Sequence, residues 1–273
     1  VLDGFIISGG NANGFGIPYD AGGGLRIEGG NPTIANCAFR LNSAVYGGGT
    51  ELFDGADATV IDCTFHDNRA TFRGGGLHCN GSAPLLVGCD FIDNDAENSG
   101  GGMRSTLSAP TLVGCRFIGN TAELGGGIVN DETDPVLSDC LLVGNEAVTT
   151  SGGMHNWHAD PILDSCTISY NTAGTVGGGM YSLAESQVAL TGCVLWANRD
   201  QDGTQTTSQI TTDGSALDPI VNYSCVQGGW STGVGNIADE PIFMDANGPD
   251  NESGNGDDNY RPGTLRADRH GIL

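Results

Sequence analysis

Seven cysteines recur along the chain at nearly constant spacing, and cysteine is a residue type that binds metals or forms disulfides. They are Cys37, Cys63, Cys89, Cys115, Cys140, Cys166 and Cys193, at intervals of 25 to 27 residues. Apolar residues flank them, and equivalent positions on stacked repeats would be about 4.8 Å apart with parallel Cβ directions. A disulfide needs Cβ atoms that point toward each other. The spacing therefore favours a buried column of free thiols over disulfide or metal chemistry.

An asparagine follows every one of these cysteines five residues later. The column is Asn42, Asn68, Asn94, Asn120, Asn145, Asn171 and Asn198. Stacked amides can bond to each other and to turn backbone that a coil buries. We therefore expect a structural role for both columns, with an asparagine-lined groove as the alternative. Cys79 and Cys225 lie outside the cysteine column, and their pairing stays open.

Strands and turns must position these columns. In the repeat Gly74 to Asn94, glycines form a turn, and residues 77–79, 85–87 and 89–91 read as three short strands. A 26-residue repeat without a helical period predicts an all-β, single-stranded parallel β-helix of eight or nine rungs. Residues 1–199 form the regular rungs. Residues 200–273 are predicted to be less regular final rungs and a C-terminal tail or cap of the same domain.

Two short motifs recur within the repeats: Gly-Gly-Gly followed by Leu, Met or Ile, and Phe-x-x-Asn. The second spans Phe39–Asn42, Phe65–Asn68, Phe91–Asn94 and Phe117–Asn120. Together they resemble the repeats of chlamydial polymorphic outer membrane proteins, and more closely the right-handed β-helix repeat proteins of planctomycetes and other environmental bacteria. The resemblance covers roughly residues 1–262, and the sequence departs from the pattern after Pro262. It implies a right-handed coil, secretion and bacterial surface display, and it implies no established catalytic residues.

Charge and hydropathy narrow the function classes. Ten Lys and Arg stand against 33 Asp and Glu, which gives a formal charge of -23. Nucleic acids and anionic membranes select basic surfaces, so neither is an expected partner. The longest apolar runs are far below about 18 residues, so membrane insertion through a helix is not expected. The chain reads as the mature part, or a fragment, of a longer secreted or cell-surface bacterial protein.

The middle residue of the first strand in each rung is predicted to point outward. The row is Arg26, Glu51, His78, Arg104, Val129, His155 and Tyr181. Side chains of this kind on a flat sheet suit glycan contact, and Trp157 adds a ring for stacking. The predicted ligand-binding residues are Arg26, His78, Arg104, His155, Trp157 and Tyr181, and the alternative is an ordinary solvated face. A metal at His155 and His158 is disfavoured because the two fall on opposite faces of a strand.

An oxygen-rich segment near the C-terminus is the candidate metal site. Ca²⁺ takes six to eight oxygen ligands in flexible loops. The predicted ligands are Asp245, Asn247, Asp250, Asp257 and Asp258. A solvated acidic turn is the alternative, and no other cofactor is expected.

A second outward row carries apolar side chains in the C-terminal half. Ile92, Ile118, Val143 and Trp196 would form an exposed stripe, and such stripes mark contact with another surface. The tail 200–273 folding back is the favoured partner, and a second molecule is the alternative. Exposed end rungs offer a further route to self-association.

These observations favour a secreted or cell-surface structural or adhesive module that binds a polysaccharide or surface glycan without catalysis. The alternative is a polysaccharide lyase or glycoside hydrolase, in which a carboxylate pair such as Asp139 and Asp164 would be about 5–10 Å apart. No rung carries a distinct cluster of Asp, Arg and Lys, so no catalytic residue is assigned. A third interpretation is a filament or sheath subunit built by end-to-end stacking.

Overall fold

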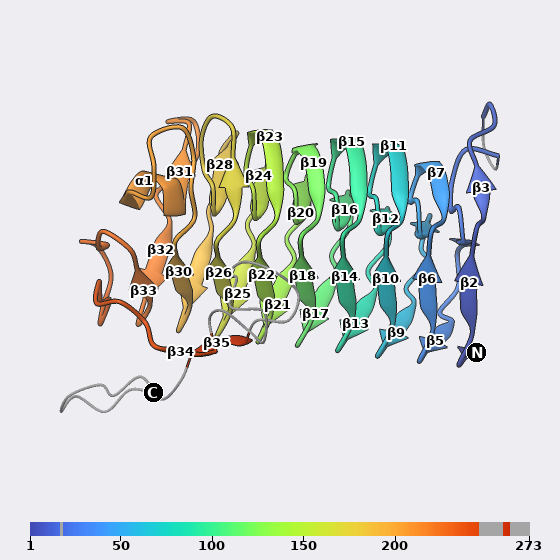
Figure 1. The fold of residues 1–273 in the computed structure, drawn as a ribbon, viewed down its shortest axis with the longest axis horizontal. Coiled ribbons are helices and arrows are strands. Elements are labelled where there is room, and N and C mark those ends of the chain that lie inside the picture. The colour runs from blue at the N-terminus through green and yellow to red at the C-terminus, as the bar shows by residue number, and fades with distance from the viewer. Residues whose placement is uncertain (17–18, 246–258, 263–273) are drawn as a thin grey trace.

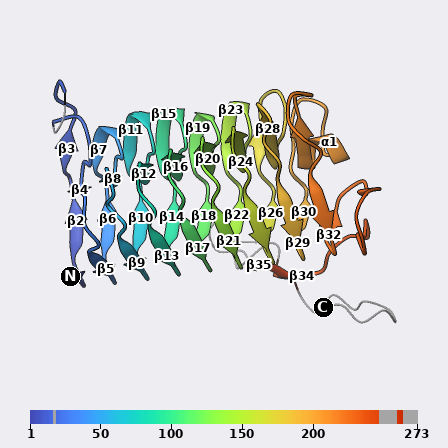
Figure 2. The same cartoon turned by 180° about the vertical axis from the view of Figure 1, so that it is seen from behind.

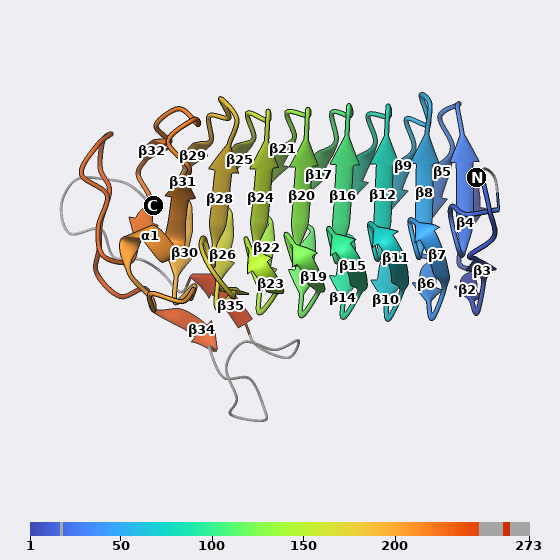
Figure 3. The ribbon, with the colours of Figure 1, turned by 90° about the horizontal axis from the view of Figure 1, so that it is seen from above.

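The chain winds into one elongated coil whose strands lie across its long axis (Figures 1 and 3). The computed structural model describes residues 1–16, 19–245 and 259–262. Each regular turn contributes one strand to each of four sheets, named A to D here, and neighbouring strands pair in parallel, about 26 residues apart. The predicted parallel β-helix is confirmed.

The strands of each sheet stack in sequence order along the coil, as Figure 2 also shows from the opposite side. Sheet A contains β1 (Leu2–Asp3), β5 (Thr33–Ala35), β9 (Thr59–Ile61), β13 (Leu85–Val87), β17 (Thr111–Val113), β21 (Val136–Ser138), β25 (Ile162–Asp164), β29 (Ala189–Thr191) and β32 (Ile220–Asn222). Sheet B contains β2 (Ile6–Ser8), β6 (Ala38–Arg40), β10 (Thr64–His66), β14 (Asp90–Ile92), β18 (Arg116–Ile118), β22 (Leu141–Val143), β26 (Thr167–Ser169), β30 (Val194–Trp196) and β33 (Cys225–Val226).

The other two sheets lie on either side of the glycine clusters. Sheet C contains β3 (Asn11–Ala12), β7 (Ser43–Tyr46), β11 (Arg69–Arg73), β15 (Asp95–Ser99), β19 (Thr121–Leu124), β23 (Glu146–Thr150) and β27 (Thr172–Ala173). Sheet D contains β4 (Leu25–Glu28), β8 (Thr50–Phe53), β12 (Leu77–Asn80), β16 (Met103–Thr106), β20 (Ile128–Asp131), β24 (Met154–Trp157), β28 (Met180–Leu183) and β31 (Ile210–Thr212).

Sheet C corrects the prediction of three strands per rung. Its strands follow the asparagine column directly, and β15 reads Asp-Ala-Glu-Asn-Ser, which carries no large apolar residue. Their inward residues are alanines, and Ala70, Ala96 and Ala122 form a small core cluster of their own. An alanine suffices there because sheet C folds back onto glycine backbone: a Cβ on Gly75 would lie 2.5 Å from the carbonyl oxygen of Asp95.

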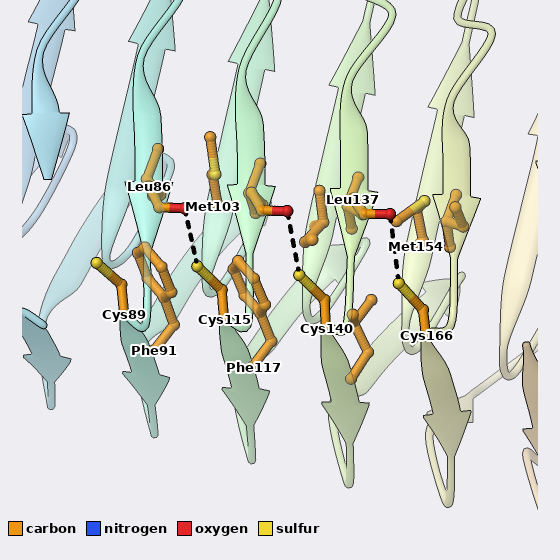
Figure 4. Close-up of a cluster of buried hydrophobic side chains, with 14 of the residues drawn as sticks. Leu86, Cys89, Phe91, Met103, Cys115, Phe117, Leu137, Cys140, Met154 and Cys166 are labelled. Carbon is orange, nitrogen blue, oxygen red and sulfur yellow. Dashed lines mark hydrogen bonds between the residues drawn. The ribbon is translucent and has the colours of Figure 1, made fainter. Parts of the chain in front are cut away.

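Apolar side chains stack by type in the interior of the coil. Phe39, Phe65, Phe91 and Phe117 are buried, and successive rings are parallel with centroids 4.5 to 4.9 Å apart. Figure 4 shows the cysteines beside them, each thiol directed at a carbonyl of the preceding turn, as in Cys115 Sγ to Leu86 O at 3.6 Å. All nine cysteines are buried and free, including Cys79 and Cys225.

The asparagines form a continuous hydrogen-bonded ladder. Asn120 Oδ1 accepts from the backbone N–H and the side-chain amide of Asn94, at 3.0 and 2.9 Å. Asn120 Nδ2 donates to Phe91 O and to Asn145 Oδ1, both at 2.9 Å. The same contacts recur from Asn42 to Asn198, so each buried amide is satisfied by its neighbours.

The residue before each column cysteine makes the bend between sheets A and B. All seven have positive φ, from 49° to 63°. They are Asn36, Asp62, Gly88, Gly114, Asp139, Ser165 and Gly192. Glycine, asparagine and aspartate tolerate this left-handed conformation best, which explains the composition of the column.

The C-terminal segment ends the regular coil. The helix α1 (Thr206–Gln209) lies beside the last strand of sheet D, and β34 (Phe243–Asp245) pairs antiparallel with β35 (Asn259–Pro262). Strand β35 contacts β26 of sheet B, and Figures 1 and 3 both place the pair beside the coil.

Candidate functional site

The outward row of sheet D is covered rather than solvated. Five of its seven side chains are buried: Glu51, His78, Arg104, Val129 and His155. Arg26 and Tyr181, at the two ends of the row, are half-buried. The ligand-binding prediction and its alternative, a solvated face, both require exposed side chains, and the burial of His78, Arg104 and His155 contradicts this.

Sheet C supplies the cover. Arg104 Nη1 donates to Ser99 Oγ of β15 at 2.7 Å, and its Nη2 pairs with the Asp131 carboxylate. The ring of Tyr46, from β7, stacks over His78 with centroids 5.7 Å apart. Because sheet C folds back at the glycine clusters, its last residues close the corner over sheet D.

The buried polar groups of the row have hydrogen-bond partners at this corner. His78 Nδ1 lies 2.8 Å from Glu51 Oε2 of the same row, and His155 Nδ1 lies 3.1 Å from Ser151 Oγ outside it. Burial, aided by the charge of Arg104, lowers the pKa of His155 to about 4. Burial and the nearby Arg73 lower the pKa of Arg104 to about 10, so this guanidinium stays charged at neutral pH. Because these side chains are buried, they leave little surface for a ligand.

The ligand-binding residues predicted from the sequence therefore fall into a buried group and an exposed or half-buried group. Trp157 is exposed over 46% of its surface, and its ring lies 5.8 Å from that of His158. His155 faces Ser151 instead, so the two histidines do not form a shared metal site. Arg26 forms an ion pair with Glu28 at 2.7 Å.

A shallow depression lies at the turns from sheet D to sheet A, on the rungs that precede Trp157. It is open, has a volume of about 480 Å³ and crosses four rungs. Its polar wall includes the carboxylates of Asp57, Glu132 and Asp134, and Leu107 is its exposed apolar residue. Glu132 N–H donates to Trp157 O at 2.9 Å, which places the tryptophan one rung away.

The sequence did not reveal this depression because small residues create it. Ala83 and Ala109 occupy the positions that Asp57 and Asp134 hold on the flanking rungs. Two of the carboxylates brace turns: Asp57 Oδ1 accepts from Ala83 N at 2.7 Å, and Asp134 Oδ1 accepts from Asp160 N at 2.8 Å. Alanine at these two positions forms no recognisable sequence motif, so the depression can be located only by aligning the rungs.

The apolar stripe on sheet B is largely covered. Ile118 and Val143 are buried at 3% and 0% exposure, and Ile92 and Trp196 are half-buried. Strand β35 of the tail lies against β26, which is between β22 and β30 in the same sheet. The favoured interpretation, a tail that folds back, agrees with this contact.

The candidate calcium ligands cannot be assembled from the described residues. Asp245 ends strand β34. Asn247, Asp250, Asp257 and Asp258 lie outside the described residues.

Burial suppresses the reactivity of the Cys63 and Cys79 thiols. Burial raises the pKa of Cys63 to about 12 and that of Cys79 well above its usual value. The thiolate is the nucleophile and the metal ligand, so these cysteines are inert at neutral pH. They act as small apolar side chains of the core.

Among the described residues, no helix has the length and hydropathy needed to cross a membrane.

Residues 4–146, just over half of the chain, match the family model described as "Right handed beta helix region". No curated protein and no solved structure matches the sequence. With its stacked parallel sheets and its repeat of about 26 residues, the chain belongs to the right-handed β-helix family.

Proposed function

We propose that this β-helix is a secreted or surface-displayed module that binds a polysaccharide without cleaving it. The observation that carries the proposal is the open, carboxylate-lined depression that includes Glu132, with exposed Trp157 on the next rung. An indole offers a flat apolar face with a polar edge, and carboxylates accept hydrogen bonds from hydroxyl groups. The depression crosses four stacked rungs, and this elongated shape suits an extended chain of sugars.

The charge of the site disfavours anionic glycans. Asp57, Glu132 and Asp134 line the depression, and none of its lining residues is Lys or Arg. The whole chain carries a formal charge of -23. A polyuronate would meet like charge at short range, whereas a neutral polysaccharide would not.

Catalysis is the weaker interpretation for this site. Asp57 and Asp134 are three rungs apart, about 14 Å at 4.8 Å per rung, beyond the separation of a glycosidase carboxylate pair. Each also accepts a backbone N–H that braces a turn. The basic and imidazole side chains of sheet D are buried, and His78 and Arg104 are engaged with Glu51 and Ser99.

A glycan array followed by isothermal titration tests the proposal. We expect neutral polysaccharides to bind the whole chain and Trp157→Ala to weaken binding at least tenfold. Val148→Ala is the matched control, because Val148 is an exposed apolar residue on sheet C, away from the depression. Release of reducing ends or unsaturated uronides from any polysaccharide would establish the lyase or hydrolase alternative instead. Equal binding by Trp157→Ala and the unmodified chain would show that Trp157 is not part of the glycan-binding site.

A further inference from the structure

Three potential metal ligands meet at the corner between sheets B and C. His66 ends β10, Asp67 follows it, and Asp93 occupies the place of Asp67 one rung later. His66 Nδ1 lies 2.8 Å from Asp67 Oδ2, and His66 Nε2 lies 3.7 Å from Asp93 Oδ2. One nitrogen or oxygen atom from each residue lies within 4.8 Å of the other two.

The rung geometry brings the two carboxylates together. Asp67 and Asp93 have φ of 54° and 51°, and their N–H groups donate to Ile92 O and Ile118 O of the following turns. Both therefore make the same bend, about 4.8 Å apart along the coil. On the next rung Gly119 takes this position, and the Asp93 carboxylate lies over it.

The space between His66 and Asp93 suits a cation. Their facing atoms, Nε2 and Oδ2, are 3.7 Å apart, which is too long for a direct hydrogen bond. Asp67 Oδ2 lies 2.8 Å from the other ring nitrogen, Nδ1. A cation between Nε2 and Oδ2 would contact a ring nitrogen and a carboxylate oxygen at once, with a second carboxylate close by.

We propose that His66 Nε2 and Asp93 bind a divalent transition metal of the zinc type, with Asp67 orienting the imidazole. Zinc binds nitrogen and oxygen at about 2.0–2.2 Å, which puts two ligand atoms of a tetrahedral ion roughly 3.4 Å apart. The observed 3.7 Å is close to this value. Asp67 lies 2.8 Å from Nδ1, on the nitrogen that a metal-binding histidine usually directs at a carboxylate.

The nature of the ligands and their exposure decide the type of ion. A nitrogen ligand suits zinc, copper or nickel, whereas calcium and magnesium prefer oxygen ligands in larger number. The side chains of His66 and Asp93 are 41% and 57% exposed, so water can complete the coordination. Arg40 pairs in register with His66 one rung earlier, and its positive charge opposes the ion.

Titration of the full-length chain with zinc chloride, in competition with a chromophoric chelator, tests this site. We expect one site that is lost in His66→Ala and weakened at least tenfold in Asp93→Asn. Asp67→Asn should weaken binding about 10-fold or more, because it removes the negative charge of the outer carboxylate beside the imidazole. Arg40→Gln should tighten it, because a repelling charge is removed. His158→Ala is the control, since it removes an exposed histidine from another corner.

Nuclear magnetic resonance of the imidazole nitrogens separates this site from zinc held elsewhere. The chain has five histidines, and His66→Ala assigns the signal of His66. Zinc should shift the Nε2 resonance of His66 and leave that of His158 in place. Unchanged zinc affinity in a folded His66→Ala variant, or no shift at His66 Nε2 under saturating zinc, would overturn the proposal.

Discussion

Asn198 Nδ2 donates a hydrogen bond to Gln209 Oε1 at 2.8 Å, and the backbone N–H of Asn198 donates to the same oxygen at 3.2 Å. Each earlier asparagine of the column makes these two bonds to the next asparagine. Gln209 thus takes the place of an eighth asparagine, although it lies only 11 residues further along the chain. Its own Nε2 donates to Asn198 O at 3.0 Å, which closes the ladder inside the C-terminal segment.

Substitution of this terminating residue should loosen the last regular turn. Gln209→Ala leaves the buried N–H groups of Asn198 without their acceptor, and an unsatisfied buried group costs about 1–3 kcal/mol. We expect a loss of stability in this range and faster hydrogen exchange at Asn198 than at Asn94. Gln205→Ala, an exposed glutamine beside the same helix, is the control. Equal exchange rates at Asn198 in both variants would contradict a terminating role for Gln209.

A substitution in the middle of the ladder should cost more. Asn120 makes two bonds as acceptor and two as side-chain donor, so Asn120→Ala leaves groups unsatisfied on both neighbouring rungs. We expect a loss of about 3 kcal/mol or more in the free energy of unfolding by urea. Glu123→Gln, on the exposed face of sheet C, should stay within about 0.5 kcal/mol. A loss below about 1 kcal/mol for Asn120→Ala would mean that water replaces the amide.

The sequence predicts the interior better than the surface. The cysteine, asparagine and bend columns repeat with one residue type or one conformational demand, so alignment of the rungs is enough to find them. The strands of sheet C could not be predicted because their inward residues are alanines that pack against glycine backbone. These strands therefore lack the large apolar side chains that mark the other strands. The burial of His78 and Arg104 depends on how closely sheet C folds back, and the depression beside Glu132 depends on two small alanines. None of these appears as a motif.

Glycine is required for different reasons in the glycine clusters and at the bends between sheets A and B. One substitution at each kind of position can distinguish the two reasons. A Cβ on Gly102 would lie 2.7 Å from both Gly127 O and Phe117 Cδ1, so Gly102→Ala overpacks the corner. Overpacking of this kind costs about 1–3 kcal/mol.

Gly114 has φ of 62° with no atom within 4 Å of an added Cβ, and asparagine or aspartate fills this bend elsewhere. Gly114→Asn should therefore cost less than about 1 kcal/mol, because asparagine tolerates the left-handed region. Thermal and urea unfolding of both variants measure the difference. The reverse order of stabilities would show that conformation, not space, selects glycine in the cluster.

His155 should make the stability of the coil depend on pH. Burial, with the charge of Arg104, lowers its pKa from 6.5 to about 4 in the folded chain. The unfolded chain therefore binds more protons between these values, and stability rises with pH across that window. The contribution is fully present above about pH 6.5 and is lost as the pH falls toward 4. A shift of this size corresponds to roughly 3 kcal/mol.

Urea unfolding at intervals from pH 4.5 to 7.5 measures this contribution. His155→Gln cannot take up the proton, so its free energy of unfolding should change less with pH than that of the unmodified chain. His158→Gln, which alters an exposed neighbour, should keep the original slope. Because carboxylates also titrate in this range, the informative quantity is the difference between the curves of the two variants. Parallel curves would show that His155 accepts its proton in the folded coil as readily as in the unfolded chain.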